Sequence, residues 1–583
     1  MKIKPAKTSG FCMGVRRAME LALEAVHTQK GPIYSYGPLI HNPQAVDLLS
    51  SKGLQELEPG EWSPETAEGG TVIIRAHGIP PQERRRLEES GFKVIDATCP
   101  RVIRVQAIIK KHTAQGFTPI IWGNPSHPEV VGLLGHADGR GLVITGPEDV
   151  PGLPDLDKVI LVAQTTQNKQ MLSSVVDAVT ARWPEALVFD TICGATQRRQ
   201  DEVSRLSGQV EAMVVVGGHN SGNTTRLAAV ARETGVKTIH IETEKELEPD
   251  WLDGVGIVGI TAGASTPNWM IKRVMRELER IAHKSDTSFY ALAYQALRLL
   301  LLSNLYVAFG AGVLCLAGAM LQGLPPRGEY FGVAFFYIHA MHMLNLFLDK
   351  EAGKFNDPDR ARFLEGHRTV LLGSGIFSAL VGLFFSLTIS LGAFLLLAFM
   401  SALGLLYAVP LTPRSWSRFT RLRRLKDIPS SKTLFLSGGW ALTLSLIPAL
   451  SPEGRLGWPT LIVGLIIFLM VFIRSALGDI IEIQGDRVVG RETIPIIIGE
   501  KKTLDLLNVA VGVFFLSLIL GWVFGLLTSL AVLLIPCAAY AALYLVLFRR
   551  EPVIGGTFFE ALIDANFILA GLLSWFWAVV WGG

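Results

Sequence analysis

Cysteine is scarce in this chain, which has five in 583 residues. No two of them form a CxxC pair, and an odd number at wide spacing is a poor disulfide framework. The N-terminal stretch MKIKPAKTSGFCMG also lacks the apolar core of a signal peptide. These absences exclude a small secreted scaffold. We expect the N-terminal half to lie in the cytosol, where thiols stay reduced.

Charged residues become rare in the second half of the chain. Residues 1–285 carry 65 Asp, Glu, Lys and Arg, whereas the slightly longer stretch 286–583 carries 40. The first share is close to the average of soluble proteins and the second is well below it. We therefore predict a soluble domain at 1–284, a linker at 285–290 and a membrane domain at 291–583. Neither half has the basic character of a nucleic-acid binder.

Short apolar, β-branched runs recur in the first half, and each ends in Gly and polar residues. They are TVIIRAHG, KVIDATCP, PIIWGNPSHPE, KVILVAQTTQ, MVVVGGHNSGNT and VGIVGITAGAST. Helical patterns follow most of these runs, which predicts an α/β fold with parallel sheets. Ligands of open parallel sheets collect beyond the carboxyl ends of the strands. The runs place several polar side chains there: His77, Cys99, His127, Glu129, Thr165, Asn223 and Ser265.

A weak internal repeat relates two cysteines, because DATC ending at Cys99 matches DTIC ending at Cys193, both after an apolar strand. Cys12 would be the third, at the start of a helix whose dipole favours a thiolate. Three thiolates could hold a structural zinc ion completed by a histidine, or an iron-sulfur cluster with one iron free of cysteine. They could also be three unrelated buried thiols.

Imidazoles, hydroxyls and Gly-containing turns in the same half suit an anionic phosphate, because they offer side-chain donors and free backbone N–H groups. The residues concerned are His41, His77, His127, Ser221, Asn223 and Ser265. Glu129 follows His127 by two residues and could relay protons between solvent and a substrate.

Eight motifs occur in order over about residues 1–282: GFCMGVRRAME, GPLIHNPQAV, RAHGIP, DATCP, SHPEVVG, QTTQ, HNSGNT and TAGAST. Together they resemble the motif set of the 4-hydroxy-3-methylbut-2-enyl diphosphate reductase family, also called IspH or LytB. The resemblance implies a three-lobed α/β domain around a central 4Fe-4S cluster. It also implies the last step of the methylerythritol phosphate route to isoprenoids, with an electron donor such as ferredoxin or flavodoxin.

Carried over motif by motif, the resemblance implies a role for each matching residue. The cluster ligands would be Cys12, Cys99 and Cys193. The substrate diphosphate would contact His41, His77, Ser221, Asn223 and Ser265, and His127 would also contact the substrate. Glu129, assisted by Thr165 and His127, would deliver the proton that lets the hydroxyl leave as water. One departure is Gly222, where many relatives have a second serine, so we expect altered affinity with retained activity.

The second half contains apolar stretches long enough to span a bilayer. We expect nine spans, at about 292–321, 331–348, 369–389, 391–411, 433–450, 459–477, 504–525, 527–548 and 558–581. With the first half in the cytosol, the loops that hold most Lys and Arg lie on the cytoplasmic side, as the positive-inside rule asks. The sequence thus predicts an all-α polytopic bundle in the cell inner (cytoplasmic) membrane.

Acidic residues beside these spans are candidates for function. Asp479, Glu482 and Asp486 share one helix face, and a second stripe contains His339, His342, Asn345 and Asp349. Two facing acidic helix ends could hold Mg²⁺, which in turn holds a diphosphate. Alternatively, these charges are solvated or paired with Arg474, Arg487 and Arg491.

The stretches NLFLDKEAGKFNDPDR (345–360) and DIIEIQGDRVVGRETIPIIIG (479–499) resemble the paired Asp-rich motifs of the UbiA superfamily of intramembrane prenyltransferases. The resemblance covers about residues 290–583. It implies Mg²⁺-dependent transfer of a prenyl group from a prenyl diphosphate to an aromatic or lipid acceptor. The implied Mg²⁺ ligands are Asp349, Asp479, Glu482 and Asp486. The implied substrate contacts are Asn345, Lys426 and Arg487.

Two residues depart from the first Asp-rich motif, since Leu346 and Gly353 stand where the family commonly has acidic residues. The main prediction remains a bifunctional, membrane-attached isoprenoid enzyme. One alternative makes the membrane half a non-catalytic anchor or lipid-binding module for the reductase. A second alternative is a zinc-binding regulatory domain on a transporter.

Overall fold

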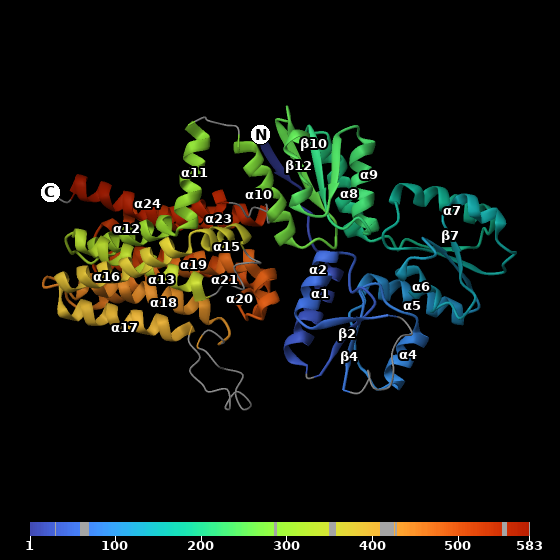
Figure 1. Cartoon of the computed structure of the whole chain (residues 1–583), viewed down its shortest axis with the longest axis horizontal. Coiled ribbons are helices and arrows are strands. Elements are labelled where there is room, and N and C mark those ends of the chain that lie inside the picture. The colour runs from blue at the N-terminus through green and yellow to red at the C-terminus, as the bar shows by residue number, and fades with distance from the viewer. Residues whose placement is uncertain are drawn as a thin grey trace. The chain divides into compact units, whose positions relative to one another are not determined.

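The computed structural model describes residues 1–29, 31–58, 69–284, 289–348, 357–408, 425, 428–550 and 557–581. The chain divides into two compact units, Met1–Lys284 and Ser285–Gly583. The first unit contains strands and helices, and the described part of the second contains helices alone (Figure 1). The α/β class predicted for the first half and the helical class predicted for the second are therefore confirmed. Most of the expected linker lies outside the described residues.

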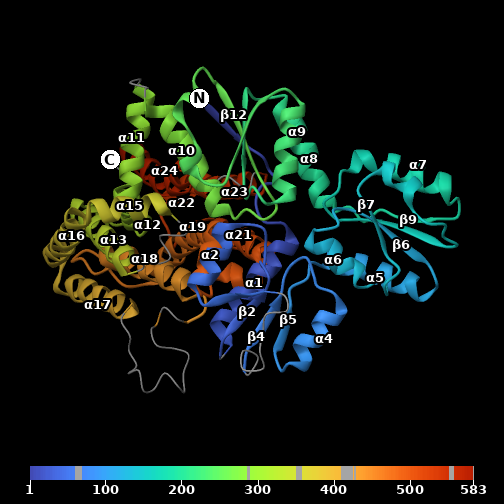
Figure 2. The same ribbon diagram turned by 45° about the vertical axis from the view of Figure 1, so that its right-hand side comes forward.

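The first unit contains three sheets of four parallel strands each, seen as three groups of arrows in Figure 2. Sheet A consists of β1 (Lys2–Pro5), β10 (Ala212–Val216), β11 (Lys237–Ile241) and β12 (Ile257–Ala262). Sheet B consists of β2 (Ile33–Tyr36), β3 (Leu54–Leu57), β4 (Thr71–Ile74) and β5 (Lys93–Asp96). Sheet C consists of β6 (Thr118–Trp122), β7 (Leu142–Ile144), β8 (Val159–Ala163) and β9 (Leu187–Phe189).

The three sheets share one strand order. Sheet B runs β3-β2-β4-β5 and sheet C runs β7-β6-β8-β9, so the first strand of each lies beside the third and the fourth lies at an edge. Sheet A runs β11-β10-β12-β1, and its edge position beside β12 is taken by the N-terminal strand. Lys2 pairs there with Ile257 and Pro5 with Ile260. The chain thus builds the same four-strand unit three times.

Helices cover these sheets, as parallel sheets with apolar residues on both faces require. The central strands β4, β8 and β10 bury every residue. The α-helices are α1 (Met13–Thr28), α2 (Pro43–Ser51), α4 (Pro81–Glu89), α5 (Pro100–Ala114), α6 (Pro128–Leu134), α7 (Leu172–Arg182), α8 (Gly194–Ser207), α9 (Gly222–Glu233) and α10 (Asn268–Lys284). Short 3-10 helices span Pro147–Gly152, Lys169–Met171, Glu244–Glu246 and Pro249–Leu252. Proline begins four of the α-helices, where its missing N–H costs nothing.

The segment between β1 and α1 is held by a carboxylate on α8. Glu202 accepts hydrogen bonds from the backbone N–H of Lys7 at 2.7 Å and of Thr8 at 2.8 Å, and from the Thr8 hydroxyl at 2.5 Å. The Glu202 side chain is buried at 9% exposure. This contact joins residues far apart in the chain and fixes the segment that leads to Cys12.

The second unit is a bundle of helices (Figure 1). They are α11 (Phe289–Leu302), α12 (Leu305–Leu321), α13 (Gly328–Leu348), α15 (Pro358–Gly366), α16 (Arg368–Ile389), α17 (Leu391–Ala408), α18 (Ser431–Ala449), α19 (Trp458–Val489), α20 (Ile494–Ile498), α21 (Glu500–Val523), α22 (Leu530–Leu533), α23 (Ile535–Arg550) and α24 (Thr557–Trp581). One apolar core runs through α12, α13, α18, α19, α21 and α24.

Small residues let the apolar helices of the bundle approach closely. A Cβ on Gly571 of α24 would lie 2.5 Å from Val313 Cβ, and one on Gly310 of α12 would lie 3.0 Å from Phe567 Cβ. Glycine on each partner therefore lets α12 and α24 pack nearly backbone to backbone. Such packing is how helices associate in lipid, where burial of apolar surface gives little advantage.

Six helices of the described chain are long and apolar enough to cross a membrane: α13, α16, α19, α21, the α22–α23 segment and α24. The pair α11 and α12 makes a seventh span if it counts as one, although it is bent by 75°. The expected count of nine spans is therefore not confirmed. The expected spans at 391–411 and 433–450 are helices, α17 and α18, but they do not qualify as spans. The apolar part of α17 is short, and α18 has five Ser and Thr among 19 residues.

We predict that Glu202→Ala lowers the free energy of unfolding of the first unit by about 2–4 kcal/mol, because three donors lose their buried acceptor. Thermal unfolding of the full chain in detergent, followed by tryptophan fluorescence, measures the change. Asp201→Ala is the matched control, since Asp201 is exposed on the same helix and should change stability by less than about 0.5 kcal/mol. Equal melting of the two variants would contradict the role of Glu202.

Candidate functional sites

The first unit has three lobes, each of which is one sheet with the helices that cover it. The three cysteines of this unit occupy equivalent places in the three lobes. Each is the N-cap residue of the helix that follows the edge strand of its sheet. Cys12 follows β1 and precedes α1, Cys99 follows β5 and precedes α5, and Cys193 follows β9 and precedes α8. The internal repeat found in the sequence between Cys99 and Cys193 therefore has a third member at Cys12.

The same three thiols lie near one another. Gly14, two residues after Cys12, lies so close to Cys99 that a Cβ there would be 2.9 Å from Cys99 Cβ and nearer still to its sulfur. Burial raises the pKa of the Cys99 thiol, N–H groups of its own helix lower it, and the thiols of Cys12 and Cys193 raise it again. Arg199 lies beside them, since it donates to the Gly10 carbonyl at 2.5 Å and feels the charges of Cys12 and Cys193.

The spacing of the thiols bears on what they can hold. Four sulfurs around one tetrahedral zinc ion at 2.3 Å would lie about 3.8 Å apart. Within the described chain, the three cysteines do not form a group whose ligand atoms all lie within 4.8 Å of one another. Their donor set and wider spacing fit a cluster of several iron atoms better than a single ion.

A histidine trio forms a second group, and its members follow two neighbouring strands of sheet B and one strand of sheet C. His41 follows β2, His77 follows β4 and His127 follows β6. Their ring centroids are 4.4 Å apart for His41 and His77, 5.6 Å for His41 and His127, and 5.4 Å for His77 and His127. Nε2 of His41 and Nδ1 of His77 are buried without a protein partner, so both can bind a ligand.

These imidazoles are neutral at neutral pH. Burial lowers the pKa of His127 to about 4, with further contributions from His41 and Arg75. Burial also lowers the pKa of His77 well below its usual value and that of His41 below it. The His127 Nδ1 accepts the Glu129 N–H at 3.1 Å, which places the ring proton on Nε2.

Arg75 is a member of this site that sequence reasoning missed. It lies two residues before His77 and acts on all three histidines as a nearby positive charge. Burial lowers the pKa of its guanidinium, and its Nε is buried without a protein partner. The motif RAHGIP contains this arginine, but neither spacing nor residue type indicated that its side chain turns toward the histidines.

Hydroxyl and amide groups that follow strands of sheet A are the remaining candidate contacts for an anion. The Ser265 hydroxyl donates to the His41 carbonyl at 2.9 Å and lies 3.4 Å from the Ser221 hydroxyl. Ser221 caps the N-terminus of α9, whose free N–H groups favour anions. Both amide atoms of the Asn223 side chain are buried without a protein partner. A Cβ on Gly222 would meet no atom within 4 Å, so the structure has room for a larger residue there.

Glu129 is a buried acid beside the trio, with 2% exposure. Its carboxylate accepts the Thr165 N–H at 2.7 Å and the Thr165 hydroxyl at 2.9 Å. Burial raises the pKa of Glu129, and the two hydrogen bonds from Thr165 oppose that rise. The arrangement holds a carboxyl group in place while making its protonated form more accessible, as a proton donor needs.

Strand order explains why these side chains come together. In sheets B and C the first and third strands are neighbours whose connections leave in opposite directions, and such a switch point is where open parallel sheets bind ligands. The first and third strands of the three lobes lead to the polar residues His41, His77, His127, Glu129, Thr165, Ser221, Asn223 and Ser265. The edge strands lead to the cysteines. His219 is not among the predicted site residues; its ring centroid lies 4.5 Å from that of His240, and its Nε2 lies 3.5 Å from a Glu246 carboxylate oxygen.

In the second unit, two acids of α19 converge on one cation. Lys432 Nζ, at the start of α18, lies 3.0 Å from an Asp479 oxygen and 3.2 Å from a Glu482 oxygen. Asp479 is 1% exposed and also accepts a hydrogen bond from the Thr433 hydroxyl. Sequence reasoning missed Lys432, although a lone lysine at the start of an apolar helix was a usable signal.

The other residues predicted for this site are placed less closely together. Asp486 lies 3.7 Å from Arg491, and Arg487 is half-buried in the last turn of α19. Within the described chain, the acids of α19 do not bring three ligand atoms within 4.8 Å of one another. Asn345 is exposed near the end of α13. Asp349 and Lys426 lie outside the described residues.

Two side chains of the predicted histidine stripe and one arginine have partners inside the bundle. His339 Nδ1 lies 3.0 Å from the Ser378 hydroxyl, and the His342 ring packs edge-on against Trp440. Arg474, considered from the sequence as a partner of the α19 acids, pairs instead with Asp564 of α24. The proposed pairing of Arg491 with Asp486 is present.

Comparison with known proteins separates the same two halves. Residues 3–279 match the family model described as LytB protein, and residues 307–561 match the UbiA prenyltransferase family. The 4-hydroxy-3-methylbut-2-enyl diphosphate reductase of Aquifex aeolicus (strain VF5) is 43% identical over 279 residues, which are 47% of this chain and 95% of the relative.

Solved structures similar to the chain also fall into two groups. One is the structure of (E)-4-hydroxy-3-methyl-but-2-enyl diphosphate reductase, at 42% identity and a TM-score of 0.40, covering 48% of this chain and 100% of that one. Another is a UbiA homolog from Aeropyrum pernix K1, at 15% identity and a TM-score of 0.37, covering 46% of this chain and 96% of that one.

The depressed pKa of His127 predicts acid sensitivity of the first unit. Between its ordinary value of 6.5 and about 4, the unfolded chain binds a proton there that the folded chain does not. The free energy of unfolding therefore rises with pH across this window and falls on acidification. His127→Asn keeps an acceptor for the Glu129 N–H but cannot titrate, so its stability should fall less steeply from pH 6.5 to 4. Urea unfolding at several pH values measures both slopes.

Ser126→Asn is the control for this experiment, because Ser126 is exposed beside His127 and does not titrate. It should keep the slope of the unchanged chain. An unchanged slope in His127→Asn would show that the acid sensitivity arises elsewhere.

Proposed function

The chain belongs to the 4-hydroxy-3-methylbut-2-enyl diphosphate reductase (LytB) family over its first unit and carries a UbiA prenyltransferase family domain at 307–561, and from this we propose which residues perform each reaction. The chain is an oxidoreductase fused to a prenyltransferase. Its first unit removes the hydroxyl of 4-hydroxy-3-methylbut-2-enyl diphosphate reductively, which gives isopentenyl and dimethylallyl diphosphate.

Cys12, Cys99 and Cys193 would hold a 4Fe-4S cluster. The observation that carries this assignment is their equivalent placement, one N-cap from each lobe, at mutually close positions. A bound cluster would pass on the two electrons of the reduction, which the electron donor supplies. Three helix N-termini and the Arg199 guanidinium add positive potential around the thiolates, which offsets their mutual repulsion.

The diphosphate of the substrate would be bound by residues from sheets A and B. His41 and His77 present unpartnered ring nitrogens, Asn223 presents an unpartnered amide, and Ser221 and Ser265 present hydroxyls. Arg75 adds a permanent positive charge next to the histidines. An anion favours protonated imidazole, so we expect binding to take up protons and to weaken as pH rises.

Glu129 would deliver the proton that leaves with the hydroxyl. Two electrons and two protons convert the substrate into product and water, so one proton departs in water and the other ends on an allylic carbon. Thr165 fixes the Glu129 carboxyl through two hydrogen bonds, and the raised pKa makes its protonated form accessible. His127, with its ring proton on Nε2, can return a proton to the site after each turnover.

Gly222 modifies this site without disrupting it. The missing serine removes one hydroxyl from the diphosphate contacts, while the N–H groups of α9 remain. Since the backbone there has room for a side chain, we propose weaker diphosphate binding than in relatives that carry serine, with the same chemistry.

The second unit would transfer a prenyl group with Mg²⁺ held by its acids. Asp479 and Glu482 both direct an oxygen at the Lys432 ammonium, so their carboxylates already converge on a cation. Oxygen donors of this kind suit Mg²⁺. Asp486 and Asp349 would be further ligands, and Asn345, Lys426 and Arg487 would contact the diphosphate. Lys432 would join them as a counter-charge for the leaving diphosphate.

The two activities imply a place and partners for the chain. The apolar helices and the UbiA domain support a multi-pass membrane protein. We propose the cell inner (cytoplasmic) membrane, with the reductase in the cytoplasm and reduced by a soluble donor such as ferredoxin or flavodoxin. The prenyl acceptor would be an aromatic or lipid molecule.

Gly14→Ala tests the proposed cluster. The added methyl group would collide with Cys99, at a cost of about 1–3 kcal/mol, and should displace that thiol. Iron and sulfide per chain after anaerobic purification should fall sharply, together with the visible absorbance. Gly194→Ala is the matched control beside Cys193, because its nearest neighbour is an arginine nitrogen at 3.6 Å. Full iron content in Gly14→Ala would argue against a cluster at these cysteines.

Glu129→Gln tests the proton donor. The amide oxygen can still accept from Thr165, but the group cannot donate a catalytic proton. The turnover number of the reductase should fall by about 100- to 10,000-fold, while iron content and inorganic pyrophosphate binding stay unchanged. Steady-state rates with a chemical reductant measure this. Retention of more than a tenth of the activity would exclude Glu129 as the required donor.

Asp479→Asn tests whether the second unit transfers prenyl groups or serves only as a membrane anchor for the reductase. The variant should lose prenyl transfer by about 100-fold or more, since it lacks a metal ligand, and should keep full reductase activity. The assay uses labelled prenyl diphosphates of several lengths and a panel of aromatic and lipid acceptors, with and without Mg²⁺. Asp505→Asn is the control, because Asp505 is an exposed acid paired with Arg549. No product from the unchanged chain with any acceptor would favour the non-catalytic anchor.

A further inference from the structure

Helix α11 does not run in the direction of α12, the helix that follows it. Hydropathy predicts one continuous span over 292–321, but the helix breaks after Leu302 and α12 continues at 75° to it. Ser303 and Asn304 form the corner, and Asn304 has the left-handed conformation with φ of 56°. Figure 2 shows α11 and α12 as separate helices. The first span of the bundle is therefore preceded by a helix that cannot cross the bilayer with it.

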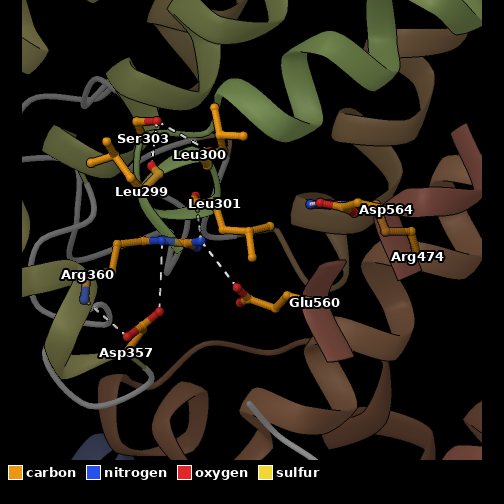
Figure 3. A network of polar contacts seen from close by, with 9 residues as sticks. All are labelled: Leu299, Leu300, Leu301, Ser303, Asp357, Arg360, Arg474, Glu560 and Asp564. Atoms are coloured by element: carbon orange, nitrogen blue, oxygen red, sulfur yellow. Dashed lines mark hydrogen bonds and ion pairs between the residues drawn. The ribbon is translucent and has the colours of Figure 1, made fainter. Parts of the chain in front are cut away.

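The corner is held by side chains that satisfy the carbonyl groups at the end of α11 (Figure 3). The Ser303 hydroxyl donates to the Leu299 carbonyl at 2.7 Å, and the Asn304 N–H donates to the Leu301 carbonyl at 3.1 Å. The Arg360 guanidinium from α15 donates to the same Leu301 carbonyl at 3.2 Å. A charged donor at a helix C-terminus is a stabilising cap.

Arg360 is itself fixed by acids from two elements. It lies 3.4 Å from Glu560 of α24, and its backbone N–H donates to Asp357 at 3.1 Å. One turn further along α24, Asp564 pairs with Arg474 of α19 (Figure 3). The side chains of Asp357, Arg360, Arg474 and Asp564 are at most 23% exposed. Breaking their contacts is therefore costly, and the corner between α11 and α12 is a fixed feature of the bundle.

The outer face of α11 is an unbroken apolar stripe. Six residues lie within about 120° around the helix axis, and all are exposed. They are Phe289, Leu292, Ala293, Ala296, Leu299 and Leu300. The exposed fractions reach 80% for Phe289 and 67% for Leu292. The opposite face carries Arg298, the one charged residue of the helix, and Leu301, which is 4% exposed.

We propose that α11 is an interfacial helix that lies along the surface of the bilayer with this apolar stripe buried among the lipids. Spanning helices tilt by about 20° on average, so a 75° corner places α11 within about 35° of the membrane plane. A short helix with one apolar face and a cation on the other has the composition of such helices. On the proposed topology, the leaflet concerned is the cytoplasmic one.

Lipid is the occupant because the stripe continues a surface that lipid must cover. Helix α11 packs against α12 and α24. Those helices expose Phe309 at 45% and Phe558 at 72%. Since α24 is long enough to span the membrane, its exposed apolar residues face acyl chains, and the stripe of α11 extends the same apolar surface sideways.

Photocrosslinking in native membranes tests this proposal. Benzophenone-alanine is introduced at Leu292 or Leu299 of the full chain, and irradiated protein is examined for covalent phospholipid by mass. Phe384, 64% exposed on the candidate span α16, is the positive control. Leu187, 41% exposed in the reductase unit, is the negative control. Retained reductase activity shows that each variant is folded.

Lipid adducts at both α11 positions, at yields within a few-fold of Phe384 and absent at Leu187, are the expected result. Adducts to another copy of the chain, or to a different protein, at both positions would overturn the proposal in favour of a protein interface. Absence of any adduct at both positions, while Phe384 labels lipid, would place the stripe in water and also overturn it.

Discussion

Parallel pairing of strands is the constraint on which the reductase site depends. All strands of a parallel sheet end at the same edge, so the loops that follow them must meet there. Three lobes with one strand order therefore present three equivalent sets of loops. The edge strand of each lobe leads to a cysteine at a helix N-terminus, and the two central strands lead to polar residues. A group of thiols drawn from residues as distant as Cys12 and Cys193 becomes compact because the fold repeats.

Inside the membrane unit, pairing of charges takes the place of strand pairing as the organising constraint. Every buried charge there must meet an opposite charge or a carbonyl group. Lys432 with Asp479, Arg474 with Asp564 and Arg360 with Glu560 each join two helices. If two helices joined in this way slid past one another, their ion pair would break and a charge would be exposed to lipid. They fix which helices are neighbours near the Asp-rich motif, while glycines between α12 and α24 fix how closely those helices approach.

Sequence patterns predicted the parts of this structure that depend on local residue order. Alternation of apolar runs and helical segments predicted parallel sheets, and DATC with DTIC predicted that two cysteines have the same surroundings. Patterns could not predict the direction of long side chains. Arg75 and Lys432 reach their partners only through packing of other elements, and no spacing rule marks them. Hydropathy also contains no information about the direction of a helix. It therefore predicted one continuous span over 292–321, although the helix is broken at Ser303 and Asn304. The roles of the individual site residues remain predictions from resemblance and geometry.

The edge position of β1 in sheet A has a consequence for the order in which the protein is made. Cys12 is translated first among the three cysteines, yet the strand that positions it pairs with β12, which is the last strand of the first unit to be translated. Sheets B and C can complete their strands as they emerge from the ribosome, whereas sheet A closes last. The three thiols therefore come together only when synthesis has nearly reached the first membrane helices, so completion of this thiol group and membrane insertion of the same chain fall in one interval of its synthesis.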